Sequence, residues 1–62
     1  MLRKALAQLP TRQREVLDMV FYHGLMVDET AGVLDIPPGA ARRHYERGKR
    51  RLRRLLPPEI KL

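Results

Sequence analysis

Residues 38–56 read PGAARRHYERGKRRLRRLL, and this segment decides the fold because its residues separate onto two faces of a helix. A turn of about 100° per residue places small and apolar side chains on one face: Ala41, Tyr45, Gly48, Leu52, Leu55 and Leu56. The opposite face carries Arg43, Glu46, Arg47, Arg50 and Arg54, with Arg42 and Arg53 at its flanks. We therefore expect the first face to pack on the rest of the domain and the second to meet solvent or a polyanion.

The same segment has clear helix boundaries. Pro38 suits the first turn of a helix, where its missing N–H is not needed, and Pro57 restricts the residue before it. A helix of about 18 residues, ending at Leu55 or Leu56, is about 27 Å long. We expect its C-terminal turns to project from the core of so small a domain. Gly48 costs a helix about 1 kcal/mol relative to alanine, and it predicts close approach of another helix backbone.

Three shorter segments with helical periodicity precede this helix, at about residues 2–8, 12–22 and 27–34. Breakers that contain proline or glycine separate the segments, and none shows the alternation of a strand. Thr11 is the expected N-cap of the second segment, and Gly24 is its expected left-handed C-cap. The sequence thus predicts an all-α fold of about four helices.

The last two helices form a recognisable unit within a single small domain that spans residues 1–62. A short helix at 27–34, a tight connection and a longer helix with a basic outer face are typical of a helix-turn-helix. In this arrangement the second helix is the recognition helix and lies in the major groove of DNA.

The charge is unevenly distributed along the chain. Residues 1–37 carry four basic and five acidic side chains, a net charge of −1, whereas residues 38–62 carry nine basic and two acidic ones, a net charge of +7. A charge run of this kind is often only a solvated helix face, but here a single acid, Glu46, lies among eight cations between positions 42 and 54. This distribution favours a polyanion as the partner.

Composition excludes several other functions. The chain has no cysteine, and its two histidines, His23 and His44, are far apart in sequence, so neither a metal nor another cofactor is expected. The adjacent acids Asp28 and Glu29 point in different directions on a helix, and 62 residues leave little room for an active site, so no enzymatic activity or small-molecule substrate is expected. No apolar run approaches the roughly 20 residues of a membrane span. We expect a soluble, cytoplasmic protein without a membrane partner.

Four pieces of the chain occur in the same order and spacing in one known family. They are LPTRQREVL at residues 9–17; Gly24-Leu25 with Glu29, Ala31, Val33 and Leu34; Ile36 with Gly39; and RGKRRL at residues 47–52. Together they resemble region 4 of the sigma-70 superfamily, and in particular the small extracytoplasmic-function sigma factors. The resemblance extends over residues 5–56.

The resemblance implies a function for the last helix and partners for the domain. The helix would recognise the promoter −35 element in double-stranded DNA, and the domain would dock on the flap of the RNA polymerase β subunit, with an anti-sigma factor as a further partner. Matching the family's stretch Gly-Thr-Val-Lys-Ser-Arg-Leu-x-Arg-Ala to residues 39–48 assigns base reading to Arg42, Arg43, Glu46 and Arg47. The residues expected to contact phosphate are Ala40, His44, Lys49, Arg50, Arg53 and Arg54.

The chain departs from the family at several positions. Met26 and Pro37 stand where the family usually has Ser or Thr as a helix N-cap, a loss of about 1 kcal/mol each. Ala40 replaces a Thr that commonly touches phosphate, and Arg43 replaces a Ser on the reading face. These departures indicate a specialised or partner-stabilised member.

Other readings remain open. The DNA-binding domain of response regulators also has an Arg-Glu-Val-Leu start and favours histidine at position 44, but its spacing is one residue shorter than the seven positions from Leu17 to Gly24. A protein-interaction module would dock on polymerase or an anti-sigma factor through an apolar edge made of Leu2, Leu6, Met19, Tyr22 and Leu25. A basic amphipathic helix for anionic membranes or RNA is disfavoured, because the apolar stripe is needed to cover the domain.

Overall fold

The computed structural model describes residues 2–60, which form four helices: α1 (Leu2–Ala7), α2 (Thr11–His23), α3 (Val27–Leu34) and α4 (Pro38–Leu55). No strand occurs within this part of the chain. The all-α fold and its four helices are confirmed. The bounds of α3 are those predicted, and the other helices differ by one residue at one or both ends, the usual uncertainty of helix termini. The predicted domain limits at residues 1 and 62 lie outside the described residues.

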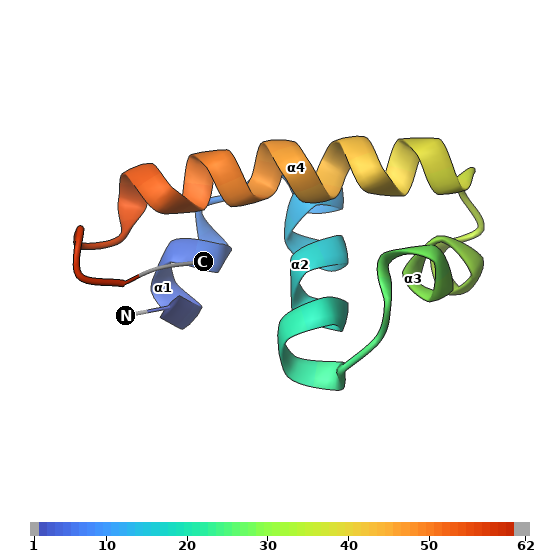
Figure 1. The fold of residues 1–62 in the computed structure, drawn as a ribbon, viewed down its shortest axis with the longest axis horizontal. Coiled ribbons are helices and arrows are strands. Elements are labelled where there is room, and N and C mark those ends of the chain that lie inside the picture. Colours follow the sequence, from blue (N-terminus) through green and yellow to red (C-terminus); the bar gives the residue numbers. More distant parts are fainter. Residues whose placement is uncertain (1, 61–62) are drawn as a thin grey trace.

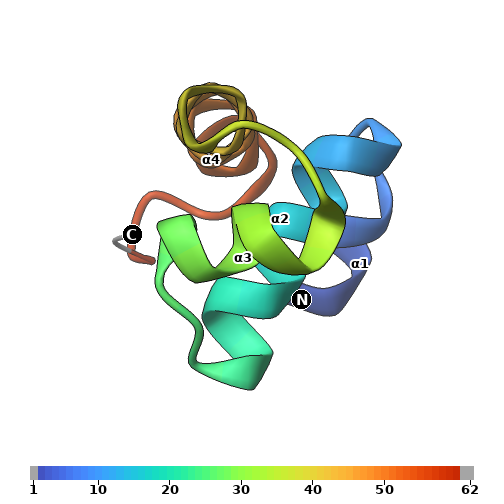
Figure 2. The same ribbon diagram turned by 90° about the vertical axis from the view of Figure 1, so that its right-hand side faces the viewer.

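The fourth helix, α4, lies along one side of the molecule, and the other three pack beneath it (Figure 1). α3 lies under its N-terminal end, α2 under its middle and α1 under its C-terminal end. Seen end-on, α4 has the other helices on one side and leaves its opposite side uncovered (Figure 2). The pair α3 and α4 with its short connection is the predicted helix-turn-helix.

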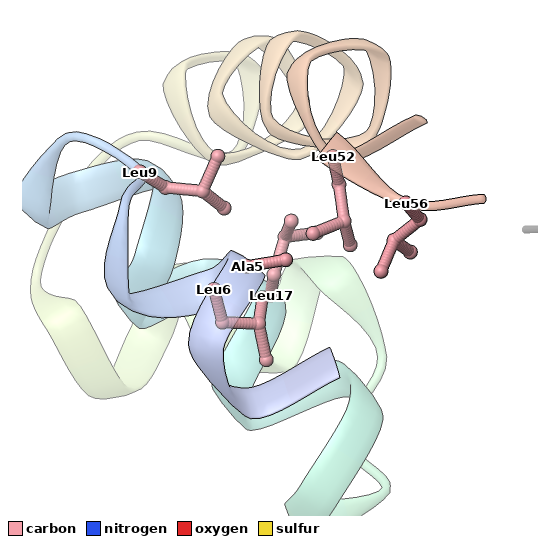
Figure 3. Packing of buried hydrophobic residues seen from close by; sticks show 6 residues of the cluster. All are labelled: Ala5, Leu6, Leu9, Leu17, Leu52 and Leu56. Atoms are coloured by element: carbon pink, nitrogen blue, oxygen red, sulfur yellow. The ribbon is translucent and has the colours of Figure 1, made fainter. Parts of the chain in front are cut away.

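The C-terminal turns of α4 pack on α1, and the prediction that they project from the core is wrong. Leu52 is fully buried and Leu56 is 6% exposed. Both belong to one hydrophobic cluster with Ala5 and Leu6 of α1 and with Leu17 of α2 (Figure 3). The reason is that α1, although short, lies directly under the end of α4 and supplies the apolar surface that covers it.

The predicted inward stripe of α4 is confirmed at most of its positions. The helix buries Ala41, Gly48 and Leu52, and Tyr45 packs partly buried against the core. Leu55 is the exception, with 40% of its surface exposed. The helix ends there, and the extended backbone of Leu56 (φ −102°, ψ 154°) carries that side chain into the core instead.

Neither α2 nor α3 has a Ser or Thr residue as its N-cap. The N-cap of α2 is Pro10, so the prediction of Thr11 as its N-cap is wrong. At the other end of α2, Gly24 adopts the predicted left-handed conformation (φ 68°) and donates its N–H to Met19 O. Met26 caps α3 and its side chain makes no capping bond, but its backbone N–H donates to Glu29 Oε1 at 2.8 Å. This bond is the half of a capping box that Glu supplies, and it satisfies the N–H of Met26 itself.

Buried polar groups in α3 are also satisfied locally. The hydroxyl of Thr30 is fully buried and donates to the backbone oxygen of Met26 at 3.1 Å. Asp35 ends the helix in a left-handed conformation (φ 56°) that Asp tolerates better than most residues. α4 then starts with Pro38 in its first turn, as predicted, and with Pro37 as a cap that makes no side-chain bond.

Candidate nucleic-acid interface

The four residues predicted to read bases lie together on the uncovered side of α4. Arg42, Arg43, Glu46 and Arg47 are all exposed, and with Arg50 they line an open hollow of about 420 Å³. They share one face because residues four apart on a helix lie above one another. In the end-on view no other helix crosses the side of α4 that faces away from α1, α2 and α3 (Figure 2).

This face is strongly positive because most of its arginines have no acidic partner. Within residues 2–60 the ion pairs are Arg12 with Glu15 and Arg42 with Asp28. Arg43, Arg47 and Arg50 therefore lie beyond ion-pair distance of every described carboxylate. Unpaired guanidinium groups keep their full hydrogen-bonding capacity for phosphate or for guanine edges.

Arg42 differs from its neighbours because it reaches α3. Its Nη2 lies 3.4 Å from Oδ1 of Asp28, in the first turn of α3, and both side chains are more than half exposed. The pair joins the two helices of the helix-turn-helix across their outer surface. An exposed pair of this kind stabilises a fold by at most about 1 kcal/mol, so its main effect is on the position and charge of Arg42.

The residues predicted to hold phosphate are spread along α4 and differ in exposure. Arg50, Arg53 and Arg54 are exposed, and Ala40 is half-buried in the first turns of the helix. Lys49 is also half-buried, with its Nζ 4.9 Å from the centroid of the Tyr45 ring. This cation–π contact holds the ammonium group against the helix surface.

His44 lies at the edge of the face, where α2 begins. Partial burial, followed by the positive charges of Arg12, Arg43 and Arg47, lowers the pKa of His44 below its usual value. Arg12, the second residue of α2, thus belongs to the charged surroundings of the face. Sequence reasoning missed Arg12 because nothing in its own segment relates it to α4.

A second hollow, of about 230 Å³, lies on the α2 side of α4 and contains two residues that the sequence analysis did not assign. It is lined by Gln13 of α2 and by Arg47, Arg50, Arg51 and Arg54 of α4. Arg51 lies between the two faces of the helical wheel, and Gln13 is a polar residue in the first turn of α2. Only the packing of the two helices reveals their common position.

The predicted protein-docking edge needs one correction. Leu6 is 2% exposed and lies in the core cluster, so a partner cannot reach it, and we remove it from the edge. Leu2, Met19 and Leu25 are half-buried, and Tyr22 is 46% exposed. The guanidinium carbon of Arg3 lies 5.5 Å from the centroid of the Tyr22 ring, beside a hollow of about 350 Å³ lined by Arg3, Asp18, Tyr22 and His23.

Two further properties concern the described part of the chain as a whole. Across residues 2–60, His, Asp and Glu side chains nowhere gather in a group that would hold a metal ion. Over the same residues, no helix has the length and apolar character needed to cross a membrane.

The short helix α3, the tight connection and the uncovered basic face of α4 define a helix-turn-helix DNA-binding domain. The family model described as sigma-70, region 4, matches residues 1–52, and the chain belongs to this family. It is thus a sigma-factor DNA-binding domain that functions in transcription, from a family that interacts with promoter DNA and RNA polymerase and is not catalytic. No curated protein and no solved structure matches the chain significantly.

Proposed function

We propose that this domain recognises the promoter −35 element by placing the N-terminal half of α4 in the major groove, as in sigma factors of the extracytoplasmic-function type. The observation that carries the proposal is the set Arg42, Arg43, Glu46 and Arg47, exposed together on the side of α4 that no other helix covers. The major groove, about 12 Å wide, admits one helix of this kind.

Each of the four side chains has a chemical role in this proposal. Arg42, Arg43 and Arg47 are forked donors that match the O6 and N7 acceptors of guanine, and Glu46 is an acceptor for the N4 amino group of cytosine. Glu46 supports base reading in particular, because a carboxylate on a surface used only for phosphates would weaken binding. The flanking Arg50, Arg53 and Arg54 supply sequence-independent attraction to the backbone.

A titration of labelled duplexes tests this function. The domain should bind a duplex that contains its preferred −35 element at least about tenfold more tightly than a scrambled duplex, since each good bidentate contact discriminates by about 1–3 kcal/mol. The preferred element is found by selection from random duplexes. Affinity that is equal for all sequences at every salt concentration would contradict the proposal.

We propose in addition that the same domain docks on the β flap of RNA polymerase through Leu2, Met19, Tyr22 and Leu25. Tyr22 supports this role because it is a large aromatic residue that stays nearly half exposed, with Arg3 over its ring. Aromatic and arginine side chains are the types most often found at the centres of protein interfaces. A domain that works only as an interaction module would bind the isolated flap tightly and promoter DNA weakly. Parallel titrations of the domain with the flap and with promoter DNA therefore distinguish this function from DNA recognition.

The membrane and RNA alternative receives no support from the packing of α4. The apolar side chains that a surface-seeking helix would insert, Leu52 and Leu56, are buried against α1 and α2.

A further inference from the structure

The hollow on the α2 side of α4 is a built feature of the helix packing. Gly48 allows α2 to come close to α4, so that a Cβ atom at position 48 would stand 3.4 Å from Cβ of Gln13. This approach places Gln13 beside the arginines of α4. Arg47, Arg51 and Arg54 follow one another at helical spacing along the flank that faces α2, and Arg50 completes the lining of the hollow.

The polar groups of this cleft have no partners within the described residues. Arg47, Arg50, Arg51 and Arg54 all lie beyond ion-pair distance of any described carboxylate. Gln13 Oε1 is buried and accepts no hydrogen bond, although four guanidinium groups line the same hollow. The arginines thus make no hydrogen bond to the amide oxygen, and their N–H groups are the donors that this hollow offers to an anion.

Four guanidinium groups around one volume fit a ligand with several negative charges. Phosphate oxygens are the acceptors that the planar fork of arginine binds best, and bidentate contacts from different sides fix their position. The volume of about 230 Å³ is below the roughly 300 Å³ at which pockets for drug-sized ligands begin. It accommodates two or three linked phosphate groups and leaves any attached base or sugar outside.

We propose that this cleft, built on Gln13 and Arg51, binds linked phosphate groups, supplied either by a free oligophosphate or by consecutive phosphates of a DNA backbone. The site extends the proposed DNA contacts to a residue of α2. Arg47 and Arg50 line both this cleft and the hollow of the recognition face, so the two surfaces are continuous.

The first experiment titrates the 62-residue protein with inorganic tripolyphosphate in about 0.15 M salt, where weak surface attraction is screened. Binding is followed by amide NMR shifts and by calorimetry, and it needs no DNA, so its outcome is independent of the −35 proposal. We expect saturation at one equivalent, with shifts at the Gln13 side-chain amide. The variant Arg51→Gln should bind about tenfold more weakly, the loss expected for a hydrogen bond to a charged group.

Two more variants make the result specific to the cleft. Arg14→Gln removes the same charge from the neighbouring, exposed position of α2 outside the cleft, and its affinity should stay within about twofold of the original. Gln13→Glu keeps the shape of the side chain and places a carboxylate among the arginines. It should abolish tripolyphosphate binding and raise the melting temperature. Binding that does not saturate, or that falls equally in Arg51→Gln and Arg14→Gln, would overturn the proposal.

A competition experiment distinguishes the two sources of phosphate. Tripolyphosphate that displaces a duplex from the original protein, with weaker displacement in Arg51→Gln, supports the DNA backbone as occupant. Tripolyphosphate that binds the protein–DNA complex without displacing the duplex supports a free oligophosphate.

Discussion

A Cβ atom at Gly48 would lie 2.9 Å from Cδ1 of Leu17 and 3.3 Å from its Cγ, so α4 crosses α2 at a distance that suits glycine. Leu17 is fully buried and has little freedom to move away. Gly48 predicts close approach of another helix backbone, but the nearest atoms belong to the Leu17 side chain. The contact sets the distance between the recognition helix and the centre of the core.

Gly48→Ala is therefore expected to destabilise the domain. Alanine gains about 1 kcal/mol of helix propensity, but forcing an extra carbon into a packed core costs about 1–3 kcal/mol. We expect a net loss of about 1 kcal/mol, measured by urea or thermal unfolding. Gly32→Ala is the matched control, because Gly32 lies in α3 with nothing within 4 Å of the added carbon, and it should gain up to about 1 kcal/mol. Equal gains in both variants would contradict the packing argument.

Arg47→Ala and Arg53→Ala should weaken DNA binding in different ways. Arg47 is a proposed base reader, so its loss should reduce discrimination among −35 variants by about 1–3 kcal/mol. Arg53 is a proposed phosphate contact, so its loss should weaken all sequences alike and lower the slope of log K against log salt by about 1. Titrations of both variants at several salt concentrations measure the two effects. The assignments are wrong if the two variants change discrimination and slope in the same way.

Asp28→Asn should tighten DNA binding, because it frees Arg42 and removes a negative charge beside the proposed reading face. We expect a gain of about two- to fivefold in affinity, in keeping with an exposed ion pair worth less than about 1 kcal/mol. Asp35→Asn is the control. It changes the net charge equally, lies outside the ion pair with Arg42, and keeps a residue that tolerates the left-handed conformation at position 35. An equal gain in both variants would show that only overall charge matters.

The stability of the domain should fall as the pH is lowered through the range of His44. Burial and the nearby arginines lower the pKa of His44 in the folded protein, so below the ordinary histidine value of about 6.5 the unfolded chain takes up more protons. The contribution of His44 to the free energy of unfolding is fully present above about pH 6.5, and it is lost as the pH falls through the pKa of His44 in the folded protein. His44→Gln should flatten this part of the stability curve, and His23→Gln should leave the contribution of His44 in place. The free energy of unfolding is measured between about pH 5 and 8 for the original and both variants. If it depends on pH as steeply in His44→Gln as in the original, the pH dependence does not come from His44.

Tyr22→Ser should weaken binding to the isolated β flap by about tenfold or more, since truncation of a central aromatic residue typically costs at least about 1–2 kcal/mol. Its affinity for DNA should stay unchanged, because Tyr22 lies on α2 and outside the hollows of α4. Val33→Ser serves as the control, since Val33 is a 62% exposed apolar residue of α3 outside the proposed edge. A larger loss with Val33→Ser would move the docking surface to α3.

The elements of this fold were predictable from the sequence because each depends on neighbours within one or two turns. The period of α4, the prolines at its start and the left-handed Gly24 are local features, and the structure confirms them. The uncovered face with Arg42, Arg43, Glu46 and Arg47 follows from the same period, since a stripe that packs inward leaves the opposite stripe outside.

The sequence by itself thus determined the four helices, the helix-turn-helix and the face of α4 that stays uncovered. Only the tertiary structure decided that α1 lies under the end of α4, that Leu6 is therefore buried, and that Gln13 and Arg51 line the same cleft. The physical reason is that helical periodicity is an interaction between residues three or four positions apart, whereas these relationships join segments distant in sequence. The approach of α2 to α4, for example, depends on the contact between Gly48 and Leu17, which are 31 positions apart.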